Sequence, residues 1–329
     1  MKELIDVYRL IKKDLDKVNQ CLNDVLLKNA SPVERSVIEY LLAHQGKQLR
    51  PVLVFLSTYL FKSDFTPEEK NQLILAATAI ETIHLASLVH DDVIDEADVR
   101  RDAKTLRSKF GNQVAVTMGV YLYSVALELI AKLGSISILA ELSATVKIMC
   151  QGELLQNDLR LNQNYKQDQY YQVIKSKTAV LFKSACVLGT LLFNQSKQVT
   201  DDVSQYAMQL GYAYQLADDF LDIFGKNSDL NKTVGQDFYQ GQLTLPMIYV
   251  VEQMTAAEKD LFWRCINLKD NQGLVLLNKK IKETTVGDTL KSIIDQRLTT
   301  AKLALDSFEH NRYYKSLVFL ADYVAKRVK

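Results

Sequence analysis

Two aspartate-rich segments are the residues of this chain best suited to chemistry. They are His90–Asp95 (HDDVID) and Ala217–Asp222 (ADDFLD), and each contains the pattern DDxxD after an apolar run. On an α-helix the first and fifth positions of this pattern lie about 40° apart on one face, one turn along the axis. Each segment is therefore predicted to direct at least two carboxylates the same way.

A single DDxxD pattern is more often the solvated end of a helix than a functional site. Two copies set into apolar sequence make a functional site the better interpretation, because desolvated carboxylates must be paired or must bind a metal. Oxygen ligands favour a hard cation such as Mg²⁺, which is typically held by one or two carboxylates together with substrate phosphates. With only four histidines in the chain, an imidazole-based metal centre is not indicated. The two segments suggest several Mg²⁺ ions that clamp a polyanion.

Basic residues that could bind a diphosphate accompany both segments. Arginine suits this task because its guanidinium can form two parallel hydrogen bonds with phosphate oxygens. The candidates are Lys47 and Arg50 in GKQLRP, Arg100 and Arg101 after the first acidic segment, Lys177 before Thr178, and Lys232 after the second segment. Each alone would be interpreted as a solvent-facing side chain, but together they form an ordered series along the chain.

The elements that must position these residues are predicted to be long helices. The 329 residues include only 4 prolines and 12 glycines, so turns are few. Segments 31–34 (SPVE) and 66–69 (TPEE) each combine an N-cap hydroxyl, a proline at the first helical position and a glutamate; Thr255 is another predicted start. Apolar residues recur at helical spacing and do not alternate with period two. We predict an all-α fold with a single domain over 1–329.

Composition narrows the class of protein further. The 40 Lys+Arg residues balance 39 Asp+Glu residues, which gives no reason to expect nucleic-acid binding. The four cysteines are scattered and indicate reduced thiols rather than disulfides or a zinc site. The apolar stretch 73–89 contains Glu81 and His84, so we interpret it as a core helix and not a membrane span. We expect a soluble cytoplasmic protein.

The ordered series of motifs resembles the trans-isoprenyl (polyprenyl) diphosphate synthases over essentially the whole chain. The stretches that carry the resemblance are GKQLRP (46–51), HLASLVHDDVIDEADVRR (84–101), GELLQ (152–156), KT (177–178), YQLADDFLDIFG (214–225) and KTVGQDFYQGQLTLP (232–246). One DDxxD is unspecific, whereas all these motifs in family order are specific. The resemblance implies an isoprenoid synthase-type helical bundle around a deep central cavity, with the acidic motifs facing each other across its mouth.

The resemblance also assigns roles to the residues at matching positions. The metal ligands would be Asp91, Asp95, Asp218 and Asp222, with about three Mg²⁺ ions per active site. Asp92, Asp219 and Lys177 would complete the catalytic set. The diphosphate of isopentenyl diphosphate would be held by Lys47, Arg50, His84 and Arg101. The allylic diphosphate would be held by Arg100, Lys177, Thr178, Gln215 and Lys232.

The implied reaction is Mg²⁺-dependent prenyl transfer, in which isopentenyl diphosphate adds head-to-tail (1′-4) to an allylic diphosphate to give an all-trans polyprenyl diphosphate. Mg²⁺ and the basic residues would neutralise the leaving pyrophosphate, so that the allylic C–O bond ionises to a carbocation. The double bond of isopentenyl diphosphate then attacks, and a proton is lost to the pyrophosphate. Apolar walls would keep water from the cation.

Product length depends on the residues one turn before the first acidic motif. In this family bulky aromatics there stop growth early, whereas this chain has the small residues Ala86 and Ser87. The product is therefore expected to be longer than C20, and the family member is expected to be of the medium- or long-chain class. The simpler interpretation is that Ala86 only packs against a neighbouring helix.

Several alternatives remain open. One is a prenyl-diphosphate-binding subunit of a hetero-oligomeric synthase that needs a partner for turnover, and another is a short-chain (C15 or C20) synthase. A terpene cyclase would normally lack GKxxRP, and a phosphohydrolase with an HD pair would need more metal-binding histidines. Relatives are generally dimers, so a homodimer is expected, with a heteromer left open. The basic end VAKRVK is compatible with transient membrane contact or with a solvated tail.

Three positions depart from the family pattern. Gln48 stands where many relatives have arginine. The segment 102–105 (DAKT) stands where the family often has a glycine and a proline before the threonine, so this loop is expected to follow a different path. Asn231 replaces the glycine that usually precedes the lysine, and asparagine can also take a left-handed conformation.

Overall fold

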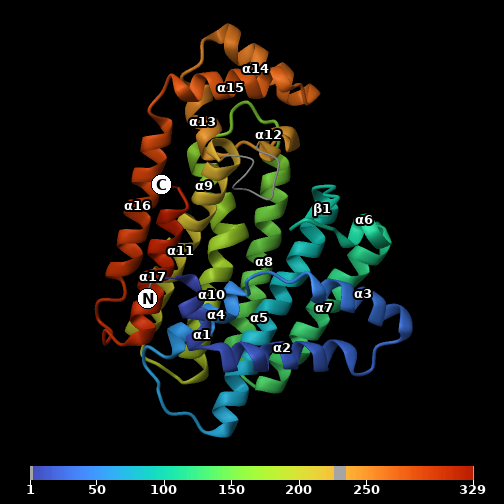
Figure 1. Ribbon diagram of the computed structural model, residues 1–329, viewed down its shortest axis with the longest axis vertical. Coiled ribbons are helices and arrows are strands. Elements are labelled where there is room, and N and C mark those ends of the chain that lie inside the picture. Colours follow the sequence, from blue (N-terminus) through green and yellow to red (C-terminus); the bar gives the residue numbers. More distant parts are fainter. Residues whose placement is uncertain (1–2, 226–234, 329) are drawn as a thin grey trace. The chain divides into compact units, whose positions relative to one another are not determined.

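The computed structural model describes residues 3–225 and 235–328, and these are almost entirely helical (Figure 1). Within this part of the chain the only strands are β1 (Val99–Arg100) and β2 (Ala103–Lys104). The predicted all-α class is confirmed. Lys232 and Asn231 lie outside the described residues. The chain divides into two compact units, which we describe separately; the single domain and the central cavity stay predictions.

Unit 1 comprises the described residues of Met1–Val146, Leu181–Ala207 and Ala304–Phe319. Its complete helices are α1 (Leu4–Leu10), α2 (Lys12–Leu27), α3 (Pro32–Ala43), α4 (Leu49–Thr58), α5 (Pro67–Ile94), α6 (Leu106–Phe110) and α7 (Asn112–Leu133). It also contains parts of α8 (Ile136–Leu159), α10 (Val180–Leu192), α11 (Lys197–Phe224) and α17 (Arg312–Lys326). Helix α5 packs against α2, α4 and α7, which makes it the central helix of this unit.

Helix α5 is positioned at both ends by its sequence. Thr66 Oγ1 accepts a hydrogen bond from the Glu69 N–H (3.2 Å), and the Glu69 carboxylate accepts one from the Thr66 N–H (2.9 Å), with Pro67 at the first helical position. This is the predicted capping box. The helix ends at Ile94, with Asp95 as its C-cap. The long buried helix thus delivers the first acidic motif at its C-terminal end.

Helices α5 and α7 are both long and apolar enough to cross a membrane by length and composition alone. In α5 the apolar segment is mostly buried among neighbouring helices, as expected for the core helix predicted over 73–89. In α7 less than half of the corresponding segment is buried. This difference leaves an apolar face exposed on α7.

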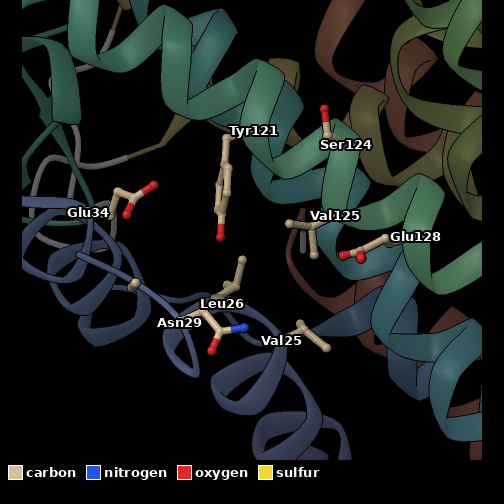
Figure 2. Close-up of a pocket in the computed structure, with 9 residues that line it drawn as sticks. Val25, Leu26, Asn29, Glu34, Tyr121, Ser124, Val125 and Glu128 are labelled. Atoms are coloured by element: carbon tan, nitrogen blue, oxygen red, sulfur yellow. The ribbon is translucent and has the colours of Figure 1, made fainter.

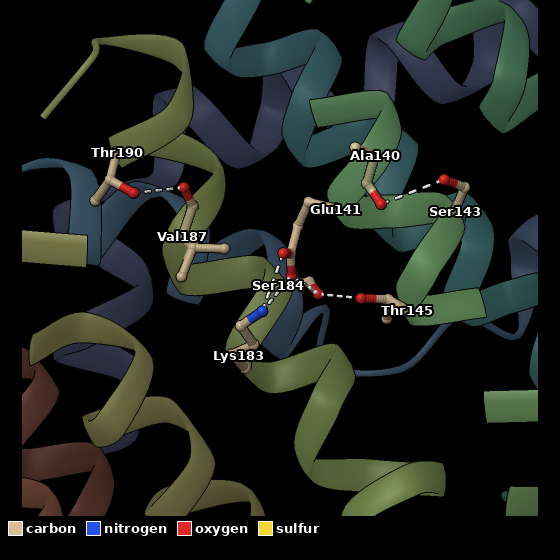
Figure 3. Close-up of polar contacts among 8 residues, drawn as sticks. All are labelled: Ala140, Glu141, Ser143, Thr145, Lys183, Ser184, Val187 and Thr190. Carbon is tan, nitrogen blue, oxygen red and sulfur yellow. Dashed lines mark hydrogen bonds and ion pairs between the residues drawn. The ribbon is translucent and has the colours of Figure 1, made fainter. Parts of the chain in front are cut away.

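A partly buried polar network joins α8 and α10 within unit 1 (Figure 3). Lys183 Nζ donates to both carboxylate oxygens of Glu141 (2.9 and 3.0 Å), and Ser184 Oγ donates to Glu141 Oε1 (2.7 Å). Ser184 is also 2.6 Å from Thr145 Oγ1. The network explains how α10 accommodates a lysine in an otherwise apolar sequence, because its charge is paired and hydrogen-bonded.

Unit 2 comprises the described residues of Lys147–Val180, Met208–Leu303 and Leu320–Lys329. It contains α9 (Gln167–Ile174), the π-helix η1 (Lys175–Ala179), α12 (Gln236–Gln240), α13 (Leu245–Glu252), α14 (Ala256–Leu268), α15 (Asn271–Lys282) and α16 (Val286–Leu303), with the remaining parts of α8, α11 and α17. Helix α15 packs against α13 and α14, and α13 also packs against α16. The second acidic motif lies near the end of α11.

The segment after the first acidic motif forms a hairpin that the sequence analysis did not predict. Val99 pairs with Lys104 and Arg100 pairs with Ala103 in antiparallel register. The turn residues Arg101 and Asp102 both have positive φ (53° and 61°), as in the two-residue turns that suit the twist of a hairpin. Residues 100–103 thus form a tight β-turn, and the expected difference from the family's path stays a prediction. Without an Asn-Gly pair, the sequence carried no signal for it.

Candidate active site

The first acidic motif separates its three aspartates into two kinds. Asp92 is buried and accepts a hydrogen bond from Arg100 Nε at 2.7 Å. Burial raises the pKa of Asp92, an effect that Arg100 partly opposes. Asp91 and Asp95 are half-buried and lie one helical turn apart. The motif therefore has an inward carboxylate paired with an arginine and two outer carboxylates near the surface.

The second acidic motif repeats this division. Asp219 is buried and accepts hydrogen bonds from Tyr170 Oη (2.6 Å) and Gln215 Nε2 (2.9 Å), and burial raises its pKa to about 7. Asp218 is half-buried and forms an ion pair with Arg327. Asp222, also half-buried, accepts hydrogen bonds from two backbone N–H groups at the start of α12 (3.2 and 3.3 Å).

The four outer carboxylates have the chemistry that Mg²⁺ requires. They are Asp91, Asp95, Asp218 and Asp222, the four residues predicted as metal ligands. Among residues 3–225 and 235–328, no three acidic, histidine or cysteine side chains converge to hold an ion unaided. Mg²⁺ is commonly held by one or two carboxylates while substrate phosphates complete its octahedral shell. Within each unit, the pair of outer carboxylates thus fits Mg²⁺ bound jointly with a diphosphate.

The predicted binding residues for isopentenyl diphosphate include a hydrogen-bonded pair in unit 1. Arg50 Nη1 donates to His84 Nε2 at 2.9 Å, and because arginine cannot accept a hydrogen bond, the neutral imidazole carries its proton on Nδ1. Burial, and then the positive charges of Arg50 and Arg101, hold the pKa of His84 well below its usual range. His84 is therefore neutral and orients Arg50.

Gly46 brings a second arginine to the same group. A Cβ atom at Gly46 would lie 2.5 Å from Arg101 Nη1, so only glycine lets the Arg101 guanidinium rest against this backbone. The neighbouring Lys47 side chain is exposed in the loop between α3 and α4, and its carbonyl accepts a hydrogen bond from Tyr8. The start of α4, helix α5 and the hairpin thus bring together Arg50, His84 and Arg101, and Lys47 directly follows Gly46 in the loop.

Glu81 is a member of this group that the sequence analysis did not assign. It is 1% exposed, and its Oε2 atom has no hydrogen-bond partner among the residues that the structure describes. Burial raises the pKa of Glu81 to about 7, and Arg50 and Arg101 oppose that rise. The signal available in the sequence was a lone acid inside the apolar stretch 73–89.

Lys177 lies in the π-helix η1 of unit 2. Its Nζ atom contacts Gln156 Oε1 and forms an ion pair with Glu153 Oε2 (2.5 Å). Both partners belong to the GELLQ motif (152–156). This motif contributed to the family resemblance, but no role was predicted for Glu153 or Gln156. A Cβ at Gly152 would lie 2.5 Å from the Ser176 side chain, so this glycine permits the close approach of α8 and η1. Single-turn π-helices recur at functional sites, but periodicity does not predict them.

The other predicted residues of unit 2 form a short chain of hydrogen bonds. Thr178 Oγ1 donates to Gln215 Oε1 (2.8 Å), and Gln215 Nε2 donates to Asp219. The structure therefore brings Thr178 and Gln215 together with the second acidic motif, and Lys177 directly precedes Thr178 in η1. In unit 1, Arg100 is bound to Asp92 and lies with the first motif.

The remaining predicted positions are local to unit 1. Ala86 is fully buried, and Ser87 is half-buried with its Oγ atom donating to the His84 carbonyl (2.9 Å). Gln48 adopts a left-handed conformation (φ 49°), and its amide donates to Asn19 and Gln45. Gln48, which stands where many relatives have arginine, therefore stabilises the loop that carries Lys47.

A pocket of about 390 Å³ lies apart from these residues, between α7 and the end of α2 (Figure 2). Figure 2 shows Tyr121 and Glu128 of α7 facing Leu26 and Asn29 across it, with Glu34 at one side. No residue that the sequence analysis assigned to substrate or metal lines this pocket.

Comparison with known proteins supports one family. The model of the polyprenyl synthetase family matches residues 32–284. The chain is 30% identical over 321 residues to heptaprenyl diphosphate synthase component 2 of Bacillus subtilis, covering 97% of this chain and 90% of that protein. It is also 30% identical over 269 residues to octaprenyl diphosphate synthase of Escherichia coli, covering 82% and 81%.

Solved structures agree over nearly the whole chain. A polyprenyl synthase from Caulobacter crescentus, complexed with calcium and isoprenyl diphosphate, is similar with a TM-score of 0.91 at 28% identity, covering 99% of this chain and 98% of that one. A decaprenyl diphosphate synthase from Rhodobacter capsulatus has a TM-score of 0.90 at 27% identity, covering 99% and 100%.

Proposed function

We propose, from the premise that this chain belongs to the polyprenyl synthetase family, that it is a Mg²⁺-dependent trans-prenyltransferase. Membership of the family makes it a transferase. The reaction joins isopentenyl diphosphate head-to-tail to an allylic diphosphate and extends an all-trans polyprenyl diphosphate. The observation that carries the proposal is the shared division of the two acidic motifs, each with one buried, hydrogen-bonded aspartate and two outer carboxylates.

The side chains support this reaction by binding and orienting charge. The outer carboxylates would hold Mg²⁺. The bound metal would neutralise the negative charge of the leaving pyrophosphate. Lys177, kept in place by Glu153 and Gln156, provides a cation for the allylic diphosphate. Arg50, Arg101 and Lys47 provide the cations for isopentenyl diphosphate. His84 is neutral and already accepts from Arg50, so its task is to orient that guanidinium.

The product is proposed to be longer than C20. Relatives of this chain are named as heptaprenyl, octaprenyl and decaprenyl diphosphate synthases. The small, buried Ala86 one turn before the first acidic motif is consistent with a long product. The test is to incubate the purified chain with Mg²⁺, labelled isopentenyl diphosphate and farnesyl diphosphate, and to resolve the products by carbon number. A series that ends beyond C20 supports the proposal, and a stop at C15 or C20 from shorter primers contradicts the long product.

A partner-dependent synthase is the second candidate. It is favoured by the similarity to a protein named as component 2 of heptaprenyl diphosphate synthase. In the same experiment, such a chain would bind diphosphate in the presence of Mg²⁺ but elongate nothing when alone. That outcome would replace the proposal of a self-sufficient enzyme.

We propose a homodimer as the working assembly, with the apolar face of α7 as its contact surface. Val116, Val120 and Leu127 follow one stripe of α7 and are 45%, 56% and 54% exposed. Large exposed apolar side chains grouped on one helix mark an interaction surface. Light scattering of wild-type and Val120→Asp protein tests this, because the charge should produce monomers if the stripe is buried between copies.

The cellular location is proposed to be the cytoplasm. All four cysteines are free thiols, as expected in a reducing compartment. Transient contact with an anionic membrane, through which an apolar product could leave, remains part of the proposal. Fractionation of cells that express the tagged chain tests both points.

A further inference from the structure

A continuous chain of four hydrogen-bonded side chains crosses unit 2 beneath the outer carboxylates. Tyr170 of α9 donates to Asp219 Oδ2 (2.6 Å), Gln215 of α11 donates to Asp219 Oδ1 (2.9 Å), and Thr178 of η1 donates to Gln215 Oε1 (2.8 Å). Tyr170 and Asp219 are 2% and 4% exposed. Neither the motifs nor the resemblance pointed to Tyr170.

The direction of each hydrogen bond determines what these side chains can still do. The Tyr170 hydroxyl and the Gln215 amide donate to different oxygens of Asp219, so the carboxylate is held from two sides and cannot rotate without breaking a bond. The single hydroxyl hydrogen of Thr178 is used on Gln215. In this arrangement Thr178 holds the network together and has no hydrogen left to donate to a diphosphate.

The network connects the two kinds of group that the reaction needs in unit 2. At one end, Asp219 lies between the outer carboxylates Asp218 and Asp222 on α11. At the other end, Thr178 directly follows Lys177 in the π-helix. Fixing Asp219 therefore fixes the side of α11 that presents the metal ligands. Fixing Thr178 holds the turn of η1 that presents the lysine.

We propose that Tyr170 is a positioning residue for catalysis, whose hydroxyl holds Asp219 and thereby keeps the outer carboxylates and Lys177 in register for a metal-bound diphosphate. The inference rests on the proposed function, because it assigns Tyr170 to the same site. Groups that orient metal ligands from behind typically change metal affinity or activity by about 10- to 100-fold when they are removed. A phenol oxygen that only filled space would have no such effect.

The test compares Tyr170→Phe with Tyr171→Phe. Tyr171 is the neighbouring residue on α9 and packs against the rings of Tyr170 and Tyr212, so its variant loses a phenol oxygen without touching Asp219. The first readout is calorimetric binding of inorganic pyrophosphate with increasing Mg²⁺, which requires no prenyl transfer. We expect Y170F to need about 10- to 100-fold more Mg²⁺ for half-saturation, with Y171F within about twofold of wild type.

A double-mutant cycle separates positioning from general stability. In an Asp219→Ala background the effect of Y170F on the Mg²⁺ requirement should shrink to about twofold, because the acceptor of the Tyr170 hydroxyl has gone. An undiminished effect would overturn the proposal. So would a Y170F protein that binds Mg²⁺ and pyrophosphate like wild type, or one in which Y171F weakens binding equally.

The role of Tyr170 can still be tested if a variant does not fold or if the enzyme does not turn over. If Y170F does not fold, Asp219→Ala removes the acceptor of the Tyr170 hydroxyl, and Mg²⁺–pyrophosphate binding like wild type by D219A would equally overturn the proposal. If the wild-type chain fails to elongate prenyl diphosphates, the proposed function fails. The Mg²⁺–pyrophosphate comparison would still decide the role of Tyr170.

Discussion

Arg327 Nη2 lies 2.5 Å from Asp218 Oδ1, so a residue near the C-terminus forms an ion pair with an outer carboxylate of the second acidic motif. The guanidinium also lies over the ring of Tyr214, 5.1 Å from its centroid. Both contacts are internal to unit 2. Since Asp218 is a predicted ligand of Mg²⁺, Arg327 and the metal ion depend on the same carboxylate.

Replacing Arg327 should therefore strengthen Mg²⁺ binding. In Arg327→Gln, Asp218 loses a competing cation, and we expect half-saturation at about three- to fivefold lower Mg²⁺, since a partly exposed ion pair contributes roughly 0.5–1 kcal/mol. Calorimetry with Mg²⁺ and pyrophosphate measures this, with Arg327→Lys as a control that keeps the charge. A weaker affinity in R327Q would instead mean that Arg327 helps to bind the diphosphate.

Glu81 should make folding stability depend on pH. Its pKa is raised from 4.5 to about 7 by burial, so the folded protein binds this proton more tightly than the unfolded chain does. The free energy of unfolding should fall as pH rises from about 4.5 to above 7, where the buried carboxylate must ionise. The loss is at most about 3 kcal/mol.

Denaturant unfolding of wild type and Glu81→Gln between pH 5 and about pH 8 isolates this residue. The difference between the two stabilities should change in favour of the glutamine variant as pH rises. Parallel profiles would show that Glu81 keeps an ordinary pKa. Asp219 titrates in a similar range in both proteins, so its contribution cancels in the difference.

Gly46→Ala should weaken binding of isopentenyl diphosphate without unfolding the protein. The added Cβ would meet the far end of the Arg101 side chain, which can move, so the cost to folding is small. The Arg101 guanidinium would then be displaced from Gly46. We expect KM for isopentenyl diphosphate to rise roughly tenfold, because one charge-assisted hydrogen bond to the diphosphate would be lost. In an Arg101→Lys background the same change should matter little. A tenfold effect in both backgrounds would point to Lys47 or the loop itself.

Ala86→Phe should shorten the product. Ala86 is fully buried one turn before Asp91, so an added ring must occupy space next to the first acidic motif. We expect the longest product to lose several isoprene units while the rate of the first condensation stays within about threefold. Chromatography of the products by carbon number measures this, and Ser87→Ala serves as a control of small volume change. An unchanged product distribution would place Ala86 away from the growing chain.

Helix boundaries and the outer carboxylates could be predicted because they depend on local chemistry. The Thr66 capping box and the helical period of the DDxxD pattern involve residues within one turn of each other. The period also correctly grouped Asp91 with Asp95 and Asp218 with Asp222. Residue types within a short segment were sufficient for these predictions.

The inward partners could not be predicted in the same way, because they come from distant parts of the chain. Tyr170 meets Asp219 across 49 residues, and Arg50 meets His84 across 34. The π-helix around Lys177 and the left-handed Arg101 depend on tertiary contacts that override local preference. Sequence patterns therefore predicted the outer groups of the candidate site, and the structure was needed to identify the groups that hold them.

In the hairpin turn, the demands of folding oppose those of the proposed substrate site. Arg101 and Asp102 occupy left-handed backbone conformations that cost L-residues roughly 1 kcal/mol each, and Asn-Gly would relieve that strain. The same turn carries the guanidinium that rests against Gly46. A screen for thermal resistance alone would favour replacing this pair and would discard a cation of the proposed substrate site. In this chain the strained arginine is therefore better explained by the proposed substrate site than by folding stability.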